Sequence, residues 1–150
     1  MKKIVSILFI MSLIVSCSKD KELETITNFS EYYELVKMTG SFSGSETTGS
    51  QMEWQETYIL NTKEGTFSKS RLFNNILTEE RGTYTYITID NQNYIEFTFN
   101  NDSDIIGNCT GNLKETLLVL EDDNKLVSTW GACDGPGLEY QKGFEFCGTI

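Results

Sequence analysis

The chain has 150 residues, with 12 basic and 22 acidic side chains and a formal net charge of −10. An acidic surface of this strength argues against nucleic-acid binding and against electrostatic docking on anionic lipid. Histidine is absent from the sequence, which removes the commonest general base and the commonest zinc ligand. A single proline, 12 glycines and many Thr, Tyr, Phe and Ile residues are typical of a β protein.

The N-terminal segment has the order of a secretory signal. Lys2 and Lys3 precede an apolar run over 4–15, which is shorter than the ~20 residues needed to span a bilayer. The next residues, 14–17 (Ile-Val-Ser-Cys), resemble a lipobox, the site read by bacterial lipoprotein-processing enzymes. The resemblance implies that 1–16 is a cleaved signal peptide and that the Cys17 thiol takes the lipid (palmitate). An ordinary signal peptide with a chance cysteine is the alternative.

The residues after Cys17 indicate the membrane to which the lipoprotein would be sent. Ser18 is not the aspartate that resembles an inner-membrane retention signal, so we expect the outer membrane. The charged run 19–24 resembles an acidic tag for export to the outer face, although a plain solvated linker would look the same. We interpret 17–29 as a lipidated tether and 30–150 as one domain. Without residues 1–16 the chain keeps 10 basic and 22 acidic residues, a formal charge of −12.

The domain begins with an ambiguous segment and continues as successive strands. Ser30 could cap a short helix over 31–36, or Tyr33 and Leu35 could open a first strand. Further on, polar and apolar residues alternate, with Trp54, Glu56, Tyr58 and Leu60 on one face. The expected strands cover 33–44, 52–61, 66–73, 77–90, 94–99, 105–109, 113–120, 125–132 and 138–146.

Turn residues separate these strands. Gly65 is expected in a left-handed conformation, Asn74 and Asn75 form another turn, and Gly82 predicts a bulge or bend within its strand. Residues 90–93, 100–104 and 121–124 are expected to be turns or loops. Sequential short antiparallel strands of this kind close into a barrel or pack as a sandwich.

Three cysteines fall in the expected domain. Cys109 and Cys133 each lie in a glycine-containing turn at the end of a strand-like run, and we predict that they form a disulfide. Closing a loop of that length would stabilise the fold by ~3 kcal/mol in the chain-entropy model. Cys147 remains unassigned. Buried free thiols are the alternative for all three, and a metal site is disfavoured because neither histidine nor a CxxC pair accompanies them.

Several segments resemble lipocalin-like bacterial lipoproteins. The resembling segments are 33–42 (YELVKMTGSF), 52–58 (MEWQETY), 65–69 (GTFSK), 82–84 (GTY) and 130–140 (WGACDGPGLEY). This resemblance implies an all-β fold, an antiparallel up-and-down barrel of about eight strands, with Cys109 as the partner of Cys133. The sequence departs from true lipocalins because their G-x-W signature is here Gly40-Ser41-Phe42. The basic residue that would stack on that tryptophan is not evident, unless Lys142 serves.

Aromatic residues recur at alternate strand positions and allow two interpretations. They either fill the barrel core or line a cavity for an apolar ligand, and a barrel of eight strands is compatible with both. Phe73 and Phe99 belong to this pattern. The candidate ligand-binding residues are Trp54, Tyr58, Phe67, Tyr84, Tyr86, Phe97 and Trp130.

No catalytic pattern emerges from the sequence. A Ser, Thr or Cys nucleophile would need a base beside it, and no motif supplies one. The carboxylate pairs at 79–80 and 122–123 are expected to diverge or to be solvated, and the oxygen-rich loop 100–104 lacks the rest of a calcium-loop pattern. We therefore expect no enzyme activity, no cofactor and no metal.

The functional expectation is an outer-membrane-anchored lipoprotein whose barrel binds a small lipophilic or aromatic ligand. The alternative is a non-enzymatic envelope interaction or structural protein with a filled barrel core and a protein partner. In either case the membrane is contacted through the lipid anchor, nucleic acid is not a partner, and the chain is expected to be a monomer.

Overall fold

The structure is a computed structural model that describes residues 30–40, 42 and 44–143. The predictions that concern the signal peptide, Cys17, the tether and Cys147 lie outside the described residues. Within them, no helix is both long and apolar enough to cross a membrane.

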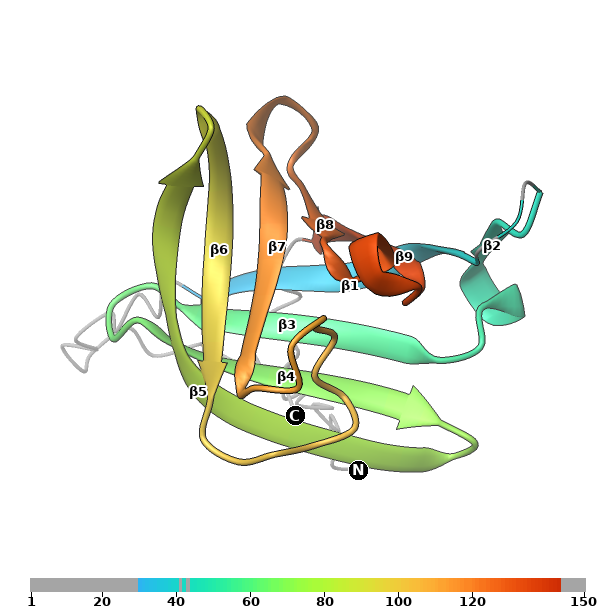
Figure 1. Ribbon diagram of the computed structural model, residues 1–150. Coiled ribbons are helices and arrows are strands. Elements are labelled where there is room, and N and C mark those ends of the chain that lie inside the picture. The colour runs from blue at the N-terminus through green and yellow to red at the C-terminus, as the bar shows by residue number, and fades with distance from the viewer. Residues whose placement is uncertain (1–29, 41, 43, 144–150) are drawn as a thin grey trace, which may run out of the picture.

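The described chain forms nine β-strands and three 3₁₀ turns (Figure 1). The strands are β1 (Ser30–Thr39), β2 (Thr47–Thr48), β3 (Gln55–Asn61), β4 (Thr66–Phe73), β5 (Ile76–Ile89), β6 (Gln92–Phe99), β7 (Lys114–Leu120), β8 (Lys125–Ser128) and β9 (Gly137–Gly143). The 3₁₀ turns cover Gly49–Gln51, Glu121–Asp123 and Trp130–Cys133.

Eight of these strands close into an antiparallel up-and-down barrel, as predicted. From β3 to β9 each strand pairs with the next along the chain, and β1 pairs with both β3 and β9. The closing register places Leu35 opposite Tyr140, with one irregularity between Leu35 and Lys37. The two-residue β2 adds to β1 beside this closed set.

The two ends of the barrel differ. We call one end the mouth; it is formed by the start of β1, the end of β9 and the turns at 62–65, 90–91 and 121–124. The hairpins β5–β6 and β7–β8 rise at this end, at the top of Figure 1. The opposite end, the capped end, carries the loop 100–113, which runs across the lower part of the same view. The β4–β5 hairpin projects to the lower right.

Strand alternation decides which side chains fill the interior. On β3, Glu56, Tyr58 and Leu60 are buried and their neighbours are not, and on β6 the buried residues are Ile95, Phe97 and Phe99. The β3 pattern confirms that Glu56, Tyr58 and Leu60 share one face, and both strands turn alternate residues inward. The core of the barrel comprises Tyr33, Leu35, Met38, Met52, Tyr58, Leu60, Phe67, Ile95, Phe97, Phe99, Leu117, Leu126, Leu138 and Tyr140.

The predicted turns are mostly confirmed. Gly65 has φ of 65°, and Asn74 and Asn75 have φ of 51° and 62°, which suits the two-residue turn of a twisted hairpin. Gly82 does not form a bulge, because it stays in register between Phe67 and Phe99. Its missing side chain instead permits close approach, since a Cβ there would lie 1.9 Å from the Thr98 carbonyl oxygen.

Several expectations at the strand level need correction. The strand expected over 125–132 ends at Ser128, and residues 130–132 belong to the 3₁₀ turn Trp130–Cys133. The segment 105–109 is a loop rather than a strand. Ile105 is buried because it packs on the capped end, and it has no strand partner. Asn108 supports the turn that follows: its side-chain carbonyl accepts hydrogen bonds from the backbone N–H groups of Thr110 and Gly111. At the start of the domain, the alternative of a helix over 31–36 is wrong, because β1 begins at Ser30. This strand ends at Thr39, not at residue 44 as expected.

Candidate functional site

Tyrosines gather around a cup at the mouth of the barrel. Tyr33 comes from β1, and Tyr84 and Tyr86 come from alternate positions of β5. The cup has a volume of about 320 Å³. Its lining residues are Glu31, Tyr33, Tyr86, Val119, Leu120, Glu121, Asn124, Lys125 and Lys142.

The rim of the cup combines a carboxylate, an ammonium group and phenols. Lys142 Nζ lies 2.8 Å from Glu31 Oε1 and 5.9 Å from the centre of the Tyr33 ring. Tyr33 donates a hydrogen bond to Glu31 at 3.1 Å. Burial, with the charge of Glu31, raises the pKa of Tyr33 above its ordinary range and that of Tyr86 to about 12. The phenols therefore remain protonated hydrogen-bond donors at neutral pH.

A column of aromatic rings leads from the cup into the interior. The Tyr86 ring centre is 5.9 Å from that of Tyr84, which is 6.1 Å from that of Phe97. Phe97 stacks on Tyr58 at 4.7 Å, and Tyr58 meets Tyr140 edge-on at 5.2 Å. Tyr58, Phe97 and Tyr140 are fully buried. The middle of the barrel is thus packed with rings, and only Tyr86 of this column lines the cup itself.

Below these rings lies a buried charged cluster of Glu56, Lys69, Arg71 and Glu115. Lys69 Nζ is 2.5 Å from Glu56 Oε1 and 2.7 Å from Glu115 Oε2, and these three side chains are completely shielded from solvent. Arg71 contacts Glu56 at 3.3 Å from its more exposed position. Two cations face two anions, so the cluster carries no net formal charge.

The neighbours of the cluster satisfy some of its polar atoms and leave others without a partner. Trp54 donates its indole N–H to Glu56 at 2.8 Å, and the Arg71 guanidinium lies 4.5 Å from the Trp54 ring centre. Burial lowers the pKa of Lys69 to about 8, while the charge of Glu115 opposes this shift. In the described part of the chain, the buried side-chain atoms without a hydrogen bond are Tyr58 Oη, Tyr140 Oη, Arg71 Nε and Glu115 Oε1. This concentration of orphaned atoms marks the cluster as a costly feature of the fold.

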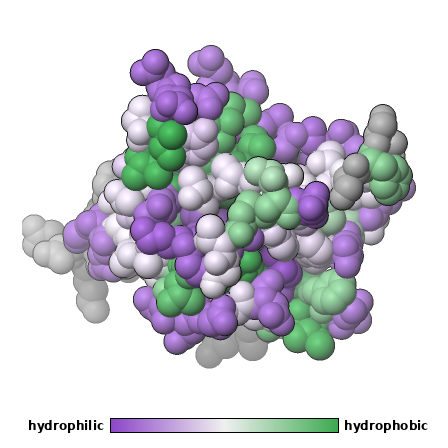
Figure 2. Space-filling model, viewed as in Figure 1, coloured by the Kyte–Doolittle hydropathy of each residue, from purple (hydrophilic) through white to green (hydrophobic). Residues whose placement is uncertain are grey.

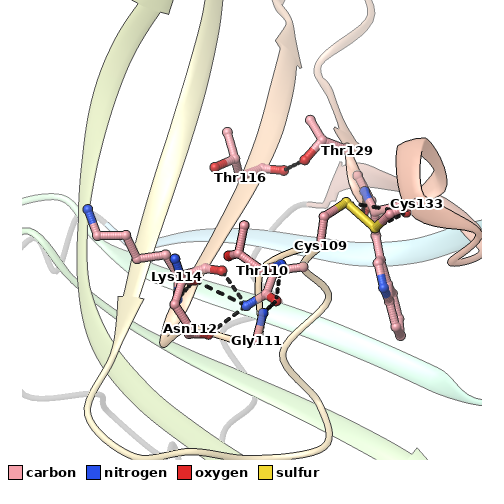
Figure 3. The surroundings of a disulfide bond; sticks show 11 residues. Cys109, Thr110, Gly111, Asn112, Lys114, Thr116, Thr129 and Cys133 are labelled. Atoms are coloured by element: carbon pink, nitrogen blue, oxygen red, sulfur yellow. Dashed lines mark hydrogen bonds between the residues drawn. A yellow bond between two sulfur atoms is a disulfide. The ribbon is translucent and has the colours of Figure 1, made fainter.

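The loop 100–113 is fastened over this cluster from two sides. Lys69 donates to the Ile105 carbonyl at 2.6 Å, and Arg71 donates to the Asp104 carbonyl at 3.0 Å. On the other side, Cys109 forms a disulfide with Cys133, the pair that the sequence predicts (Figure 3). The disulfide joins the loop to the 3₁₀ turn Trp130–Cys133. The capped end is therefore closed by both charge-assisted hydrogen bonds and a covalent bond.

The seven aromatic residues predicted to bind ligand fall into three places. Tyr84 and Tyr86 lie at the mouth. Tyr58, Phe67 and Phe97 are packed in the middle. Trp54 and Trp130 lie toward the capped end, where Trp130 fits against Gly107 and Gly135; a Cβ on either glycine would come within 3 Å of the indole.

Neither the charged cluster nor the role of Tyr33 and Lys142 at the cup was predicted from the sequence. A signal for the cluster is nevertheless present in the strand patterns. Glu56, Lys69 and Glu115 each stand two positions from a core residue on the same strand, which places a charge on an inward face. Lys142, the residue named from the sequence as a possible partner of an aromatic ring, lies over the ring of Tyr33.

Neither metal binding by the described residues nor similarity to other proteins identifies the function. Among the described residues there is no group of three or more His, Cys, Asp or Glu side chains that could hold a metal ion. In comparisons with protein-family models, curated proteins and solved structures, the chain matched none of them.

Proposed function

We propose that the protein is an outer-membrane-anchored lipoprotein whose β-barrel binds a small aromatic or lipophilic molecule at its mouth. The observation that supports ligand binding is the cup of about 320 Å³ at which Tyr33, Tyr86 and Lys142 meet. Its volume is at the lower end of the range of small-molecule sites, ~300–1,000 Å³.

The packing of the barrel favours the mouth over the interior as the place of binding. A ligand in the middle would have to displace the stacked rings of Tyr58, Phe67 and Phe97. At the mouth, Val119 and Leu120 offer apolar contact, while the Tyr86 phenol and the ammonium groups of Lys125 and Lys142 offer donors. A suitable ligand has one or two rings and carries a hydrogen-bond acceptor, while Glu31 and Glu121 offset the charge of the two lysines in the lining.

Native mass spectrometry of residues 18–150, exported to a periplasm and purified without detergent, tests this function. We expect an added mass that is lost on denaturation, together with binding of the aromatic anion anilinonaphthalene sulfonate as a probe. Tyr86→Ala should weaken probe binding at least about tenfold, a loss of ~1.4 kcal/mol. The control is Tyr94→Ala, because Tyr94 lies on the outer face of β6. A bare mass with no probe binding, or equal binding by both variants, would refute the mouth site.

Membrane anchoring requires a separate test at Cys17. Metabolic labelling with palmitate should mark the wild-type chain and leave the Cys17→Ser variant unlabelled, because the thiol is the only proposed point of attachment. Density-gradient separation of the two membranes should then place the labelled chain in the outer-membrane fraction. Label on the variant would contradict the anchor, and label in the inner-membrane fraction would contradict the destination.

A second candidate function is that of an envelope interaction protein with a solid core. The packed rings in the middle of the barrel favour it, because such a core serves as a rigid support rather than a container. The same mass measurement separates the candidates. A bare chain that co-purifies with an envelope protein from its own membrane, and releases no small molecule, would favour the interaction role.

A further inference from the structure

The tip of the β4–β5 hairpin exposes four large apolar side chains. Leu72, Phe73, Ile76 and Leu77 are 45%, 41%, 67% and 65% exposed. Single exposed apolar residues are ordinary on a protein surface, but four on consecutive pairs of one hairpin form a patch. Figure 2 shows a hydrophobic cluster at the lower right, where Figure 1 places this hairpin.

The apolar residues occupy both faces of the hairpin. Leu72 pairs with Leu77, and Phe73 pairs with Ile76. Because adjacent residues of a strand point to opposite faces, one pair lies on each side of the ribbon. A flat protein surface could cover only one of these sides, whereas a lipid interface would surround both.

The lack of charged side chains at the hairpin tip also favours a lipid interface. The segment 72–78 (LFNNILT) contains no charged residue, and its turn residues Asn74 and Asn75 are polar but neutral. The interfacial layer of a bilayer accommodates such a polar tip, while the flanking apolar side chains reach the acyl boundary. The acidic chain as a whole disfavours anionic lipid, so the fitting surface is a zwitterionic one.

One of the four tip side chains, Phe73, also contacts the capped end of the barrel. The Phe73 ring meets the Trp54 ring edge-on at 6.4 Å between centres. Trp54 in turn stacks under the Arg71 guanidinium, which is hydrogen-bonded to the loop carbonyl of Asp104. The exposed side chains are therefore presented from a braced support, so little ordering is needed when they enter lipid.

The proposed lipid anchor can reach the same bilayer. The described chain begins at Ser30, at the mouth, and β4 spans ~25 Å from there to the hairpin tip. The 13 residues of 17–29 reach at most ~45 Å when extended, which exceeds this span. Only this comparison of lengths depends on the lipid anchor at Cys17 that we propose above.

We propose that the β4–β5 hairpin inserts its apolar tip into the interface of a zwitterionic bilayer. The barrel then stands on the membrane by its capped end. Its mouth, at the opposite end, faces away from the lipid and stays open to solvent.

Vesicle flotation of residues 18–150, a chain without the acylated cysteine, tests the hairpin independently of the anchor. Phosphatidylcholine vesicles should carry the wild-type chain upward. The Ile76→Asp/Leu77→Asp variant should bind at least tenfold more weakly, because two exposed apolar side chains become charged. Ile59→Asp is the matched control, since Ile59 is 45% exposed on the barrel wall and does not belong to the tip. Circular dichroism checks that each variant keeps its β structure.

A depth measurement gives a second, direct readout. Ile76→Trp should be quenched by phosphatidylcholine brominated on its acyl chains, whereas Ile59→Trp should not. Absence of wild-type flotation, equal flotation of all variants, or equal quenching of the two tryptophans would overturn the proposal. So would loss of a wild-type dimer in the Ile76→Asp/Leu77→Asp variant by analytical ultracentrifugation, because a second copy would then cover the tip. Failure of palmitate labelling at Cys17 alone would overturn the anchor and leave the hairpin result standing.

Discussion

Replacing Lys69 by methionine tests the charged cluster most sharply. Methionine is one atom shorter than lysine and keeps most of its apolar stem, but it removes contacts to Glu56 at 2.5 Å, to Glu115 at 2.7 Å and to the Ile105 carbonyl at 2.6 Å. Glu56 keeps Arg71 as a partner, whereas Glu115 loses its ammonium partner inside the barrel. Breaking a buried ion pair from one side costs about 3–5 kcal/mol, a large part of the ~5–15 kcal/mol that stabilises a typical domain.

Urea unfolding followed by the fluorescence of Trp54 and Trp130 measures this loss. The matched control is Lys69→Met/Glu115→Gln, which removes the abandoned charge and should recover more than about 1 kcal/mol of the loss, the signature of coupled residues. Two results would refute the reasoning: a cost below about 1 kcal/mol for Lys69→Met, or a double variant as unstable as the single one. Either would mean that the remaining groups rearrange or that water reaches Glu115.

Three further outcomes are expected. Replacing Cys109 and Cys133 by serine should lower the free energy of unfolding by about 3 kcal/mol, because the disulfide closes a loop with a sequence separation of 24; urea titration measures this, and a loss below about 1 kcal/mol would show that the hydrogen bonds of the loop suffice. Burial raises the pKa of Tyr58 and Tyr140, so the folded chain retains protons that the unfolded chain releases above pH ~10. Stability from these tyrosines should therefore be intact below that pH and fall above it, less steeply in Tyr140→Phe; identical pH profiles would contradict the assignment. Gly82→Ala should cost up to about 3 kcal/mol, because its Cβ would strike the backbone of β6, and a thermal midpoint equal to that of the wild type would disprove this close approach.

The two ends of the barrel differ in structure, and we propose a different role for each. The capped end holds its loop by a disulfide and by hydrogen bonds from Lys69 and Arg71. The mouth carries short turns and an open cup. In the functions that we propose, the braced end meets lipid and the open end meets a small molecule.

Local features of the sequence were sufficient to predict most of the strands and turns. The alternation of Glu56, Tyr58 and Leu60 assigns β3 and its inward face because the side-chain period of a strand is two residues. Asn74 and Asn75 mark a hairpin because their side chains tolerate positive φ. The strand predicted at 105–109 was wrong, because Ile105 packs on the capped end and does not pair in the sheet.

Only the tertiary structure decided which residues meet. Lys69 and Glu115 are 46 positions apart, and their contact depends on the register of the intervening strands and on closure of β1 against β9. The aromatic pattern likewise left a filled core and a ligand cavity as alternatives, because side-chain volume inside a closed barrel follows from strand tilt and stagger. By itself the sequence therefore determined the strand periods and the turn chemistry, which depend on neighbours along the chain. The packed interior, the buried charges and the cup at the mouth were decided in three dimensions, where register brings distant residues together.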